Sequence, residues 1–175
     1  MAIEVHPAIV KSLLWSSEDQ TRAFAQALAQ QVKKQVQSAG PELNASIHLR
    51  GDLGAGKTTL VRYLLKALGV EGRIKSPTYA VVEPYTVSSP DAQALKPINI
   101  WHFDFYRFND PDEWEEAGFR EIFASPGLKL VEWPEKAGQH LPTADVTLAI
   151  ELTHADERRV SVQALTQAGA RLLNA

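Results

Sequence analysis

The sequence predicts an α/β fold with a mixed, mostly parallel sheet, and three observations lead to this prediction. Strand-like and helical runs alternate along most of the chain. A short apolar strand leads into a glycine-rich loop and then into a helix. Two strand-like runs near the C-terminus, residues 145–152 and 158–165, are separated by a polar turn. They predict an antiparallel hairpin that closes one edge of the sheet.

The first predicted element is an amphipathic helix. The segment Ser17–Gln20 has the form of a capping box, in which side chains bond the free backbone N–H groups of the first turn. Behind it, apolar side chains recur every fourth residue until Gly40-Pro41 interrupts the pattern, at Phe24, Leu28, Val32 and Val36. This spacing predicts a helix with one buried face.

The middle of the chain predicts the remaining strands and helices. Residues 45–50 form a short strand, and residues 58–69 form the helix behind the glycine-rich loop, ended by Gly69. Further strands are predicted where β-branched and aromatic residues gather, at 79–87, 98–106 and 128–133. The polar segment 88–97 predicts a surface loop. Asn109-Asp110-Pro111 is typical of a helix start and predicts a helix through residues 114–123.

Composition limits the classes of protein that fit. A chain of 175 residues with 45% hydrophobic content predicts a single domain, residues 1–175. The net charge of -3 argues against strong autonomous binding to nucleic acid. Without cysteine there are no disulfides and no thiolate metal sites. The start MAIEVHPAIV lacks a basic flank before an apolar run, and no apolar run approaches the roughly 20 residues of a membrane span. We therefore expect a soluble, cytoplasmic protein that does not bind membranes.

The segment Leu49–Leu60, LRGDLGAGKTTL, has the spacing of a phosphate-binding loop. Its glycines allow a tight turn with N–H groups pointing inward, and the helix behind it favours anions. We expect Lys57 to reach the β and γ phosphates of a nucleotide, and the Thr58 hydroxyl to bind Mg²⁺. The predicted fold is thus a three-layer sandwich like that of P-loop NTPases. The predicted contact residues are Asp52, Leu53, Gly54, Ala55, Gly56, Lys57, Thr58 and Thr59.

Two acidic residues end apolar strands and are candidates for the same site. INIWHFD ends at Asp104, and LKLVE ends at Glu132. A magnesium nucleotide site needs a carboxylate at the end of a neighbouring strand. We expect both to line the site, one near the metal and one near the γ phosphate or the attacking water. Their spacing does not assign the two roles.

Three nearby segments carry further candidates. Arg107 follows Asp104 and either stabilises phosphoryl charge or forms a salt bridge, with both roles open. For His102, among aromatic residues, we favour a hydrogen-bonded packing role. The segment Lys75–Tyr79, KSPTY, is either a mobile segment that senses the third phosphate or a plain turn. Trp133 either caps the core or serves as a lid or partner contact.

Taken together, GDLGAGKTT, KSPTY, HFDFYR and VEWPEK, in this order and at these intervals, resemble the TsaE (YjeE) family. This family is the ATPase component of bacterial tRNA threonylcarbamoyladenosine biosynthesis. The resemblance runs from about Ser17 to the final hairpin. It implies ATP and Mg²⁺ as cofactors, slow ATP hydrolysis, and action as a nucleotide-dependent switch on the partner proteins TsaB and TsaD. It leaves direct contact with tRNA open.

The resemblance also implies roles for individual residues. On the family pattern Thr58 and Glu132 hold Mg²⁺, Lys57 and the loop amides hold the phosphates, and Asp104 is needed for hydrolysis. The family pattern also implies that Arg158 contacts the adenine side of the nucleotide. Our hypothesis is that a switch or partner surface forms around the third phosphate, from Ser76, Pro77, Thr78, Tyr79, His102, Tyr106, Arg107 and Trp133.

Two other functions are considered for a chain with this phosphate loop, a small-molecule kinase and a GTPase. A small-molecule P-loop kinase would use Asp104 as the general base for an acceptor hydroxyl, although the sequence gives no evident acceptor pocket. A GTPase would carry an N/T-K-x-D guanine motif, and the chain has none.

Overall fold

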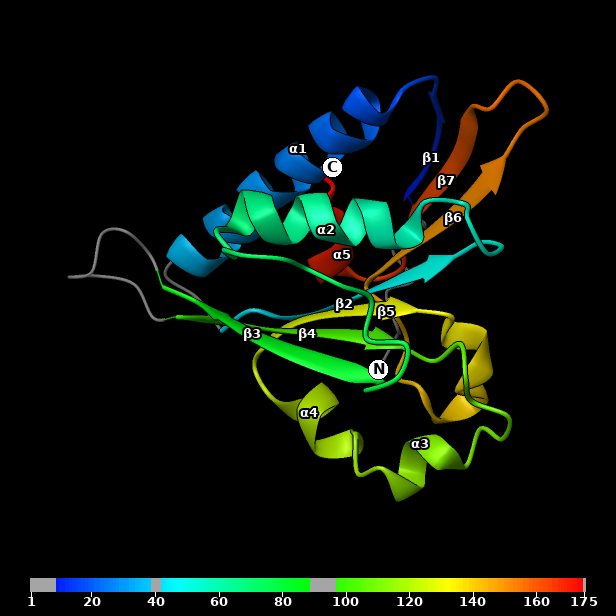
Figure 1. Ribbon diagram of the computed structural model, residues 1–175. Coiled ribbons are helices and arrows are strands. Elements are labelled where there is room, and N and C mark those ends of the chain that lie inside the picture. Colours follow the sequence, from blue (N-terminus) through cyan, green and yellow to red (C-terminus); the bar gives the residue numbers. More distant parts are fainter. Residues whose placement is uncertain (1–8, 39–41, 89–96, 175) are drawn as a thin grey trace, which may run out of the picture.

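The computed structural model describes residues 9–38, 42–88 and 97–174 (Figure 1). Seven strands lie in these ranges: β1 (Ile9–Trp15), β2 (Asn44–Arg50), β3 (Val82–Val87), β4 (Ile98–Asp104), β5 (Gly127–Glu132), β6 (Val146–Leu152) and β7 (Arg158–Ala164). They form one mixed sheet in the order β1-β7-β6-β2-β5-β4-β3. The four central strands, β6, β2, β5 and β4, are parallel. The predicted α/β fold with a mixed sheet is confirmed.

Helices cover both faces of the sheet, which gives three layers (Figure 1). One face carries α1 (Glu18–Gln37), α2 (Lys57–Leu68) and α5 (Gln167–Leu172). The other face carries α3 (Glu113–Glu116) and α4 (Arg120–Ala124), below β3, β4 and β5. Two short 3₁₀ turns, η1 (Pro134–Lys136) and η2 (Gly138–His140), follow β5.

The predicted C-terminal hairpin is present as β6 and β7, but it does not close the sheet. β1 pairs with β7 along its whole length, from Ile9 opposite Ala164 to Trp15 opposite Arg158. The edge is therefore a strand near the N-terminus that the sequence analysis did not predict. At the opposite edge β3 pairs antiparallel with β4.

Two helix predictions need correction. Ser17 is the N-cap of α1, but its side chain makes no capping bond, and Gln20 accepts from the backbone N–H of Ser16 instead. The single helix predicted over residues 114–123 is wrong, because Gly118 adopts a left-handed conformation with φ +74° and separates α3 from α4. By contrast, α2 ends as predicted, with Gly69 as a left-handed C-cap.

Separate apolar cores pack against the two faces of the sheet. The larger lies under α1 and α2 and includes Leu28 and Leu64. The second is an aromatic cluster on the other face of β4 and β5, under α3 and α4, and it includes Phe103, Trp114 and Phe123. β4 and β5 are thus packed on both sides, which fixes their ends firmly.

Two further predictions concern a surface loop and membrane-spanning helices. Most of the predicted surface loop 88–97 lies outside the described residues, since only 88 and 97 are described. Within the described ranges, none of the helices is long and apolar enough to cross a bilayer.

We predict that His48 makes the fold sensitive to acid. His48 is buried in β2, and its Nε2 has no hydrogen-bond partner among the described residues. Burial lowers the pKa of His48 to about 4, and the charge of Arg50 adds to the effect. Between pH 6.5 and 4 the unfolded chain therefore binds more protons, and the free energy of unfolding falls as the pH falls.

Urea unfolding of the parent and of His48→Leu across this range tests the prediction. The parent should lose about 3 kcal/mol more than the variant between pH 6.5 and 4, at 1.36 kcal/mol per pKa unit. Parallel stability curves for the two proteins would show that His48 contributes nothing.

Candidate functional site

The predicted phosphate loop forms a tight turn between β2 and α2. Gly51 begins it with φ +147°, and a Cβ atom there would lie 2.4 Å from the carbonyl oxygen of Ile150. Only glycine allows this approach, because a side chain would collide with the backbone of β6. Gly56 is the left-handed N-cap of α2, with φ +109°. The loop thus opens onto the N-terminus of a 12-residue helix, whose free N–H groups favour anions.

Lys57, the first residue of α2, is buried and folds back onto the loop. Its Nζ donates to the backbone oxygens of Gly51 and Asp52, the latter at 2.9 Å. It also lies 4.2 Å from the centroid of the Trp133 ring. Burial lowers the pKa of Lys57, while nearby carboxylates, Glu132 foremost, oppose this effect. Phosphate oxygens can replace the two carbonyl contacts, since they are stronger acceptors for an ammonium group.

Glu132, the last residue of β5, is buried beside the start of α2. The Thr58 hydroxyl lies 2.9 Å from both of its carboxylate oxygens, and His102 Nε2 lies 2.8 Å from Oε1. Hydroxyl and carboxylate oxygens are ligands that Mg²⁺ prefers, usually together with phosphate and water. In the described ranges there is no cluster of three or more His, Cys, Asp or Glu side chains that could hold a metal. The Thr58–Glu132 pair offers both kinds of oxygen beside the start of α2.

Asp104, the last residue of β4, is buried and in register with Glu132. The hydroxyls of Ser76 and Thr78 both donate to Asp104 Oδ2, Thr78 at 2.9 Å. The backbone N–H of Tyr106 donates to the other oxygen, Oδ1, at 3.0 Å. KSPTY is therefore tied to the acid at the end of β4.

The strand predicted from Tyr79 begins only at Val82. Residues 78–80 form a turn, and Val81 has φ +69°, an uncommon conformation for a β-branched residue. Backbone bonds from Val81 to Pro77 and from Asp104 to Val81 hold this turn against the end of β4. The segment between α2 and β3 is thus an ordered turn that presents two hydroxyls to Asp104.

A cavity of about 340 Å³ brings twelve of the predicted residues together. This volume is within the range of small-molecule sites. Residues from the phosphate loop, the KSPTY segment and the ends of β4 and β5 all contribute to its lining: Leu53, Gly54, Gly56, Lys57, Thr58, Thr59, Ser76, Thr78, Asp104, Tyr106, Glu132 and Trp133.

Aromatic side chains lie in KSPTY and just after the ends of β4 and β5. The Tyr79 side chain is 85% exposed, and the Arg107 guanidinium lies 4.0 Å from its ring centroid. The Tyr106 and Trp133 rings pack 5.1 Å apart. Arg107 thus has an aromatic partner, and the two roles considered for it from the sequence stay predictions.

Two members of the predicted partner surface do not reach the surface. His102 is 0% exposed because its side chain points into the sheet side that α2 covers, where it contacts Glu132. Pro77 is also buried. The hydrogen-bonded packing role favoured for His102 agrees with this burial.

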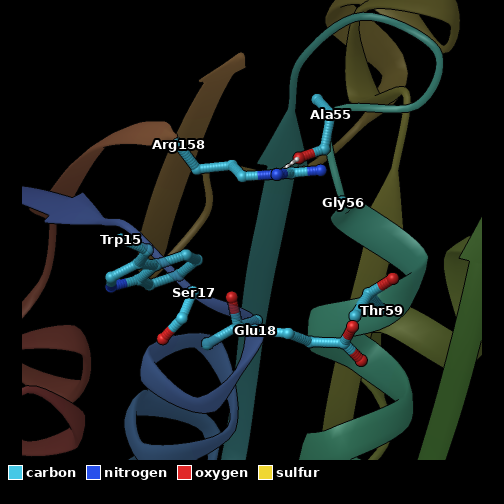
Figure 2. Close-up of a pocket in the computed structure, with 8 residues that line it drawn as sticks. Trp15, Ser17, Glu18, Ala55, Gly56, Thr59 and Arg158 are labelled. Carbon is cyan, nitrogen blue, oxygen red and sulfur yellow. Dashed lines mark hydrogen bonds between the residues drawn. The ribbon is translucent and has the colours of Figure 1, made fainter. Parts of the chain in front are cut away.

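A second, smaller pocket of about 90 Å³ adjoins the first (Figure 2). Arg158, at the start of β7, extends over the loop, and its Nε donates to the Ala55 carbonyl at 3.4 Å. Figure 2 shows Trp15 on the side opposite Thr59, and the Glu18 side chain extends from α1 toward Thr59. The pocket shares two residues with the larger cavity, so the two spaces meet at the start of α2: Gly56 and Thr59.

The wall of this pocket that comes from β1 and α1 was not predicted from the sequence. Trp15, Ser17, Glu18 and Thr21 line it, and they come from β1 and the first turn of α1. The β-branched and aromatic residues of IVKSLLW, Ile9, Val10 and Trp15, were a signal for a strand, but no local signal connects that strand with the phosphate loop. The connection arises from the pairing of β1 with β7, which brings Trp15 opposite Arg158.

Comparison with known proteins finds relatives over most of the chain. The family model described as "Threonylcarbamoyl adenosine biosynthesis protein TsaE" matches residues 15–160. A Haemophilus influenzae protein named tRNA threonylcarbamoyladenosine biosynthesis protein TsaE is 40% identical over 129 residues, 74% of this chain and 76% of the relative. A protein of the same name from Aquifex aeolicus is 33% identical over 156 residues, 88% and 96% of the two chains.

A solved structure agrees with these sequence relatives. The crystal structure of Bacillus subtilis YdiB has a TM-score of 0.69 to this chain at 25% identity, and the match covers 97% of this chain and 95% of that one. The residues matched by the family model include the phosphate loop, Asp104 and Glu132.

We predict that the Asp104 carboxylate holds KSPTY in place. Asp104→Ala removes the acceptor of both hydroxyls and of the Tyr106 N–H. Backbone amides of residues 76, 78–81 and 106 should therefore exchange with deuterium about tenfold faster or more, as expected when about 1.4 kcal/mol or more of local stabilisation is lost. Amides of β6 should be unchanged and serve as an internal control. Equal exchange in the parent and the variant would mean that the backbone bonds alone hold this turn.

Proposed function

Because the chain belongs to the TsaE family of threonylcarbamoyl adenosine biosynthesis proteins, and so to the modification of tRNA, we propose that it is a slow, Mg²⁺-dependent ATPase. We further propose that its bound nucleotide acts as a switch on partner proteins of the TsaB and TsaD type.

One observation supports this proposal above all others. A phosphate loop with its lysine, a hydroxyl–carboxylate pair suited to Mg²⁺, and a second carboxylate bonded to KSPTY line the same cavity. Each group by itself has an ordinary structural explanation. Their convergence at the carboxyl ends of parallel strands is typical of nucleotide sites in α/β proteins.

In this proposal the loop amides and Lys57 bind the phosphates. Lys57 leaves the carbonyl oxygens of Gly51 and Asp52 and turns toward the β and γ phosphates. Thr58 Oγ1 and Glu132 would hold Mg²⁺, which neutralises phosphate charge when bound. The hydrogen bond that now joins Thr58 to Glu132 is then given up.

Asp104 is the proposed catalytic carboxylate that orients the attacking water. Its Oδ2 already accepts bonds from both Ser76 and Thr78. A water can approach that oxygen fully only when at least one hydroxyl turns away, for example toward the third phosphate. Hydrolysis would thereby be linked to the position of KSPTY, which is how the third phosphate orders switch segments in other nucleotide hydrolases.

The smaller pocket is the proposed site of the nucleoside. It adjoins the phosphate cavity at Gly56 and Thr59, and the Arg158 guanidinium offers a flat surface for a base, while the largely buried Trp15 ring lines one side. This supports the adenine-side role of Arg158 and adds Trp15 to it.

The proposed partner surface consists of Tyr79, Tyr106, Arg107 and Trp133. Tyr79 of KSPTY lies against the Arg107 guanidinium, and Tyr106, which lines the cavity, packs on Trp133. Tyr and Arg are frequent in the energetic centres of protein interfaces. Movement of KSPTY would change this surface, so a partner could distinguish ATP from ADP.

We predict that Lys57 and Asp104 separate binding from turnover. Lys57→Ala should weaken ATP binding about 100-fold, because it removes the charge-assisted phosphate contacts. Asp104→Ala should bind ATP nearly as well as the parent but hydrolyse it about 100-fold more slowly. Isothermal titration and release of labelled phosphate measure the two effects, with Lys66→Ala on the exposed face of α2 as the control.

The same labelled ATP separates an ATPase from a kinase. An ATPase gives only free phosphate, whereas a kinase gives a phosphorylated acceptor. Parent-like hydrolysis by Asp104→Ala would remove that residue from the catalytic role.

We predict that partner binding depends on the nucleotide. The immobilised protein should retain purified TsaB and TsaD more strongly with a non-hydrolysable ATP analogue than with ADP or without nucleotide. Lys57→Ala should retain TsaB and TsaD equally in all three conditions, since it binds the nucleotide too weakly to respond to it. If the parent protein also retains them equally, the switch role is wrong.

A further inference from the structure

We propose that His102 is a positioning residue for Glu132, one that sets the metal affinity of the site without touching metal or nucleotide. This inference rests on the Mg²⁺-nucleotide binding proposed above. It adds a residue that neither the loop motif nor the strand-end carboxylates would indicate.

The contacts of His102 are few and specific. The side chain is 0% exposed, and its Nε2 lies 2.8 Å from Glu132 Oε1. Since a carboxylate only accepts hydrogen bonds, Nε2 carries the proton and donates. The other ring nitrogen, Nδ1, is buried and has no partner among the described residues.

This arrangement is unfavourable for packing alone. A buried polar atom without a partner costs about 1–3 kcal/mol, which an apolar side chain of similar size would avoid. The bond to Glu132 is the polar contact that an imidazole makes here and a leucine could not. We therefore infer that the role of the imidazole is to orient that carboxylate rather than to fill the core.

The bond matters most when a metal is bound. In the described structure the side chains that bond the Glu132 carboxylate are Thr58 and His102. When the Thr58 hydroxyl binds Mg²⁺, it no longer donates to Glu132. The bond from His102 then remains to hold the carboxylate in its orientation. Such outer partners of metal ligands typically change metal affinity by about 10- to 100-fold when removed.

Three variants test the role. His102→Leu removes both ring nitrogens and keeps a buried side chain. His102→Gln keeps an N–H near the position of Nε2. His48→Leu is the matched control, because His48 is also a buried histidine of the central sheet and has no hydrogen bond to Glu132.

The measurement is binding of a slowly hydrolysed ATP analogue at increasing Mg²⁺, by isothermal titration at pH 7.5. We expect His102→Leu to need about 10- to 100-fold more Mg²⁺ for half of the metal-dependent gain in affinity, with unchanged binding in EDTA. His102→Gln and His48→Leu should stay within about threefold of the parent. In a Glu132→Gln background, His102→Leu should have no further effect.

The outcomes separate this inference from the proposed function. If the parent gains affinity with Mg²⁺ and His102→Leu gains it at the same concentration, the positioning role is wrong and the proposed function stands. If His48→Leu loses as much Mg²⁺ affinity as His102→Leu, the effect is common to buried histidines of the sheet and the inference again fails. A parent without any Mg²⁺-dependent binding would overturn both.

A folding defect would not remove the test. If His102→Leu does not fold, His102→Asn replaces it, since its amide is one carbon too short to reach Glu132. Asn should then lose the Mg²⁺ response that Gln keeps, and equal responses would contradict the proposal.

Discussion

The alignment of three parallel strand ends is the constraint on which the site depends. β5 lies between β2 and β4, and its Glu132 is in register with Leu49 on one side and Asp104 on the other. The loop that follows β2 and the two carboxylates therefore meet at one edge of the sheet. Because β4 and β5 are packed on both faces, the main chain rather than a flexible segment sets these positions.

The charged groups at this edge are hydrogen-bonded to polar groups of the protein. Lys57 donates to loop carbonyls, Glu132 accepts from Thr58 and His102, and Asp104 accepts from the KSPTY hydroxyls. Burying an unpaired charge is costly, so these internal bonds stabilise the site. In the proposed function a nucleotide replaces these bonds with its own, and each replacement would move a particular segment. We propose that nucleotide binding and conformational change are coupled for this reason.

The sequence predicted the parts of the site that depend on local pattern. Glycine spacing identified the loop, and an acid at the end of an apolar run identified Asp104 and Glu132. It did not predict the order of the strands, the pairing of β1 with β7 or the pocket wall at Trp15, because these depend on contacts between residues far apart in the chain. The helix break at Gly118 was missed because the flanking residues favour a helix, and the packing of the aromatic core overrides that preference.

A crystal structure of the protein with Mg²⁺ and a non-hydrolysable ATP analogue would test whether the loop and the two strand ends form one nucleotide site. We predict a triphosphate on the loop, a metal held by Thr58 and Glu132, and Lys57 Nζ moved from the Gly51 and Asp52 carbonyls to the phosphates. A nucleotide bound elsewhere, with Lys57 still on both carbonyls and Thr58 still on Glu132, would contradict this prediction.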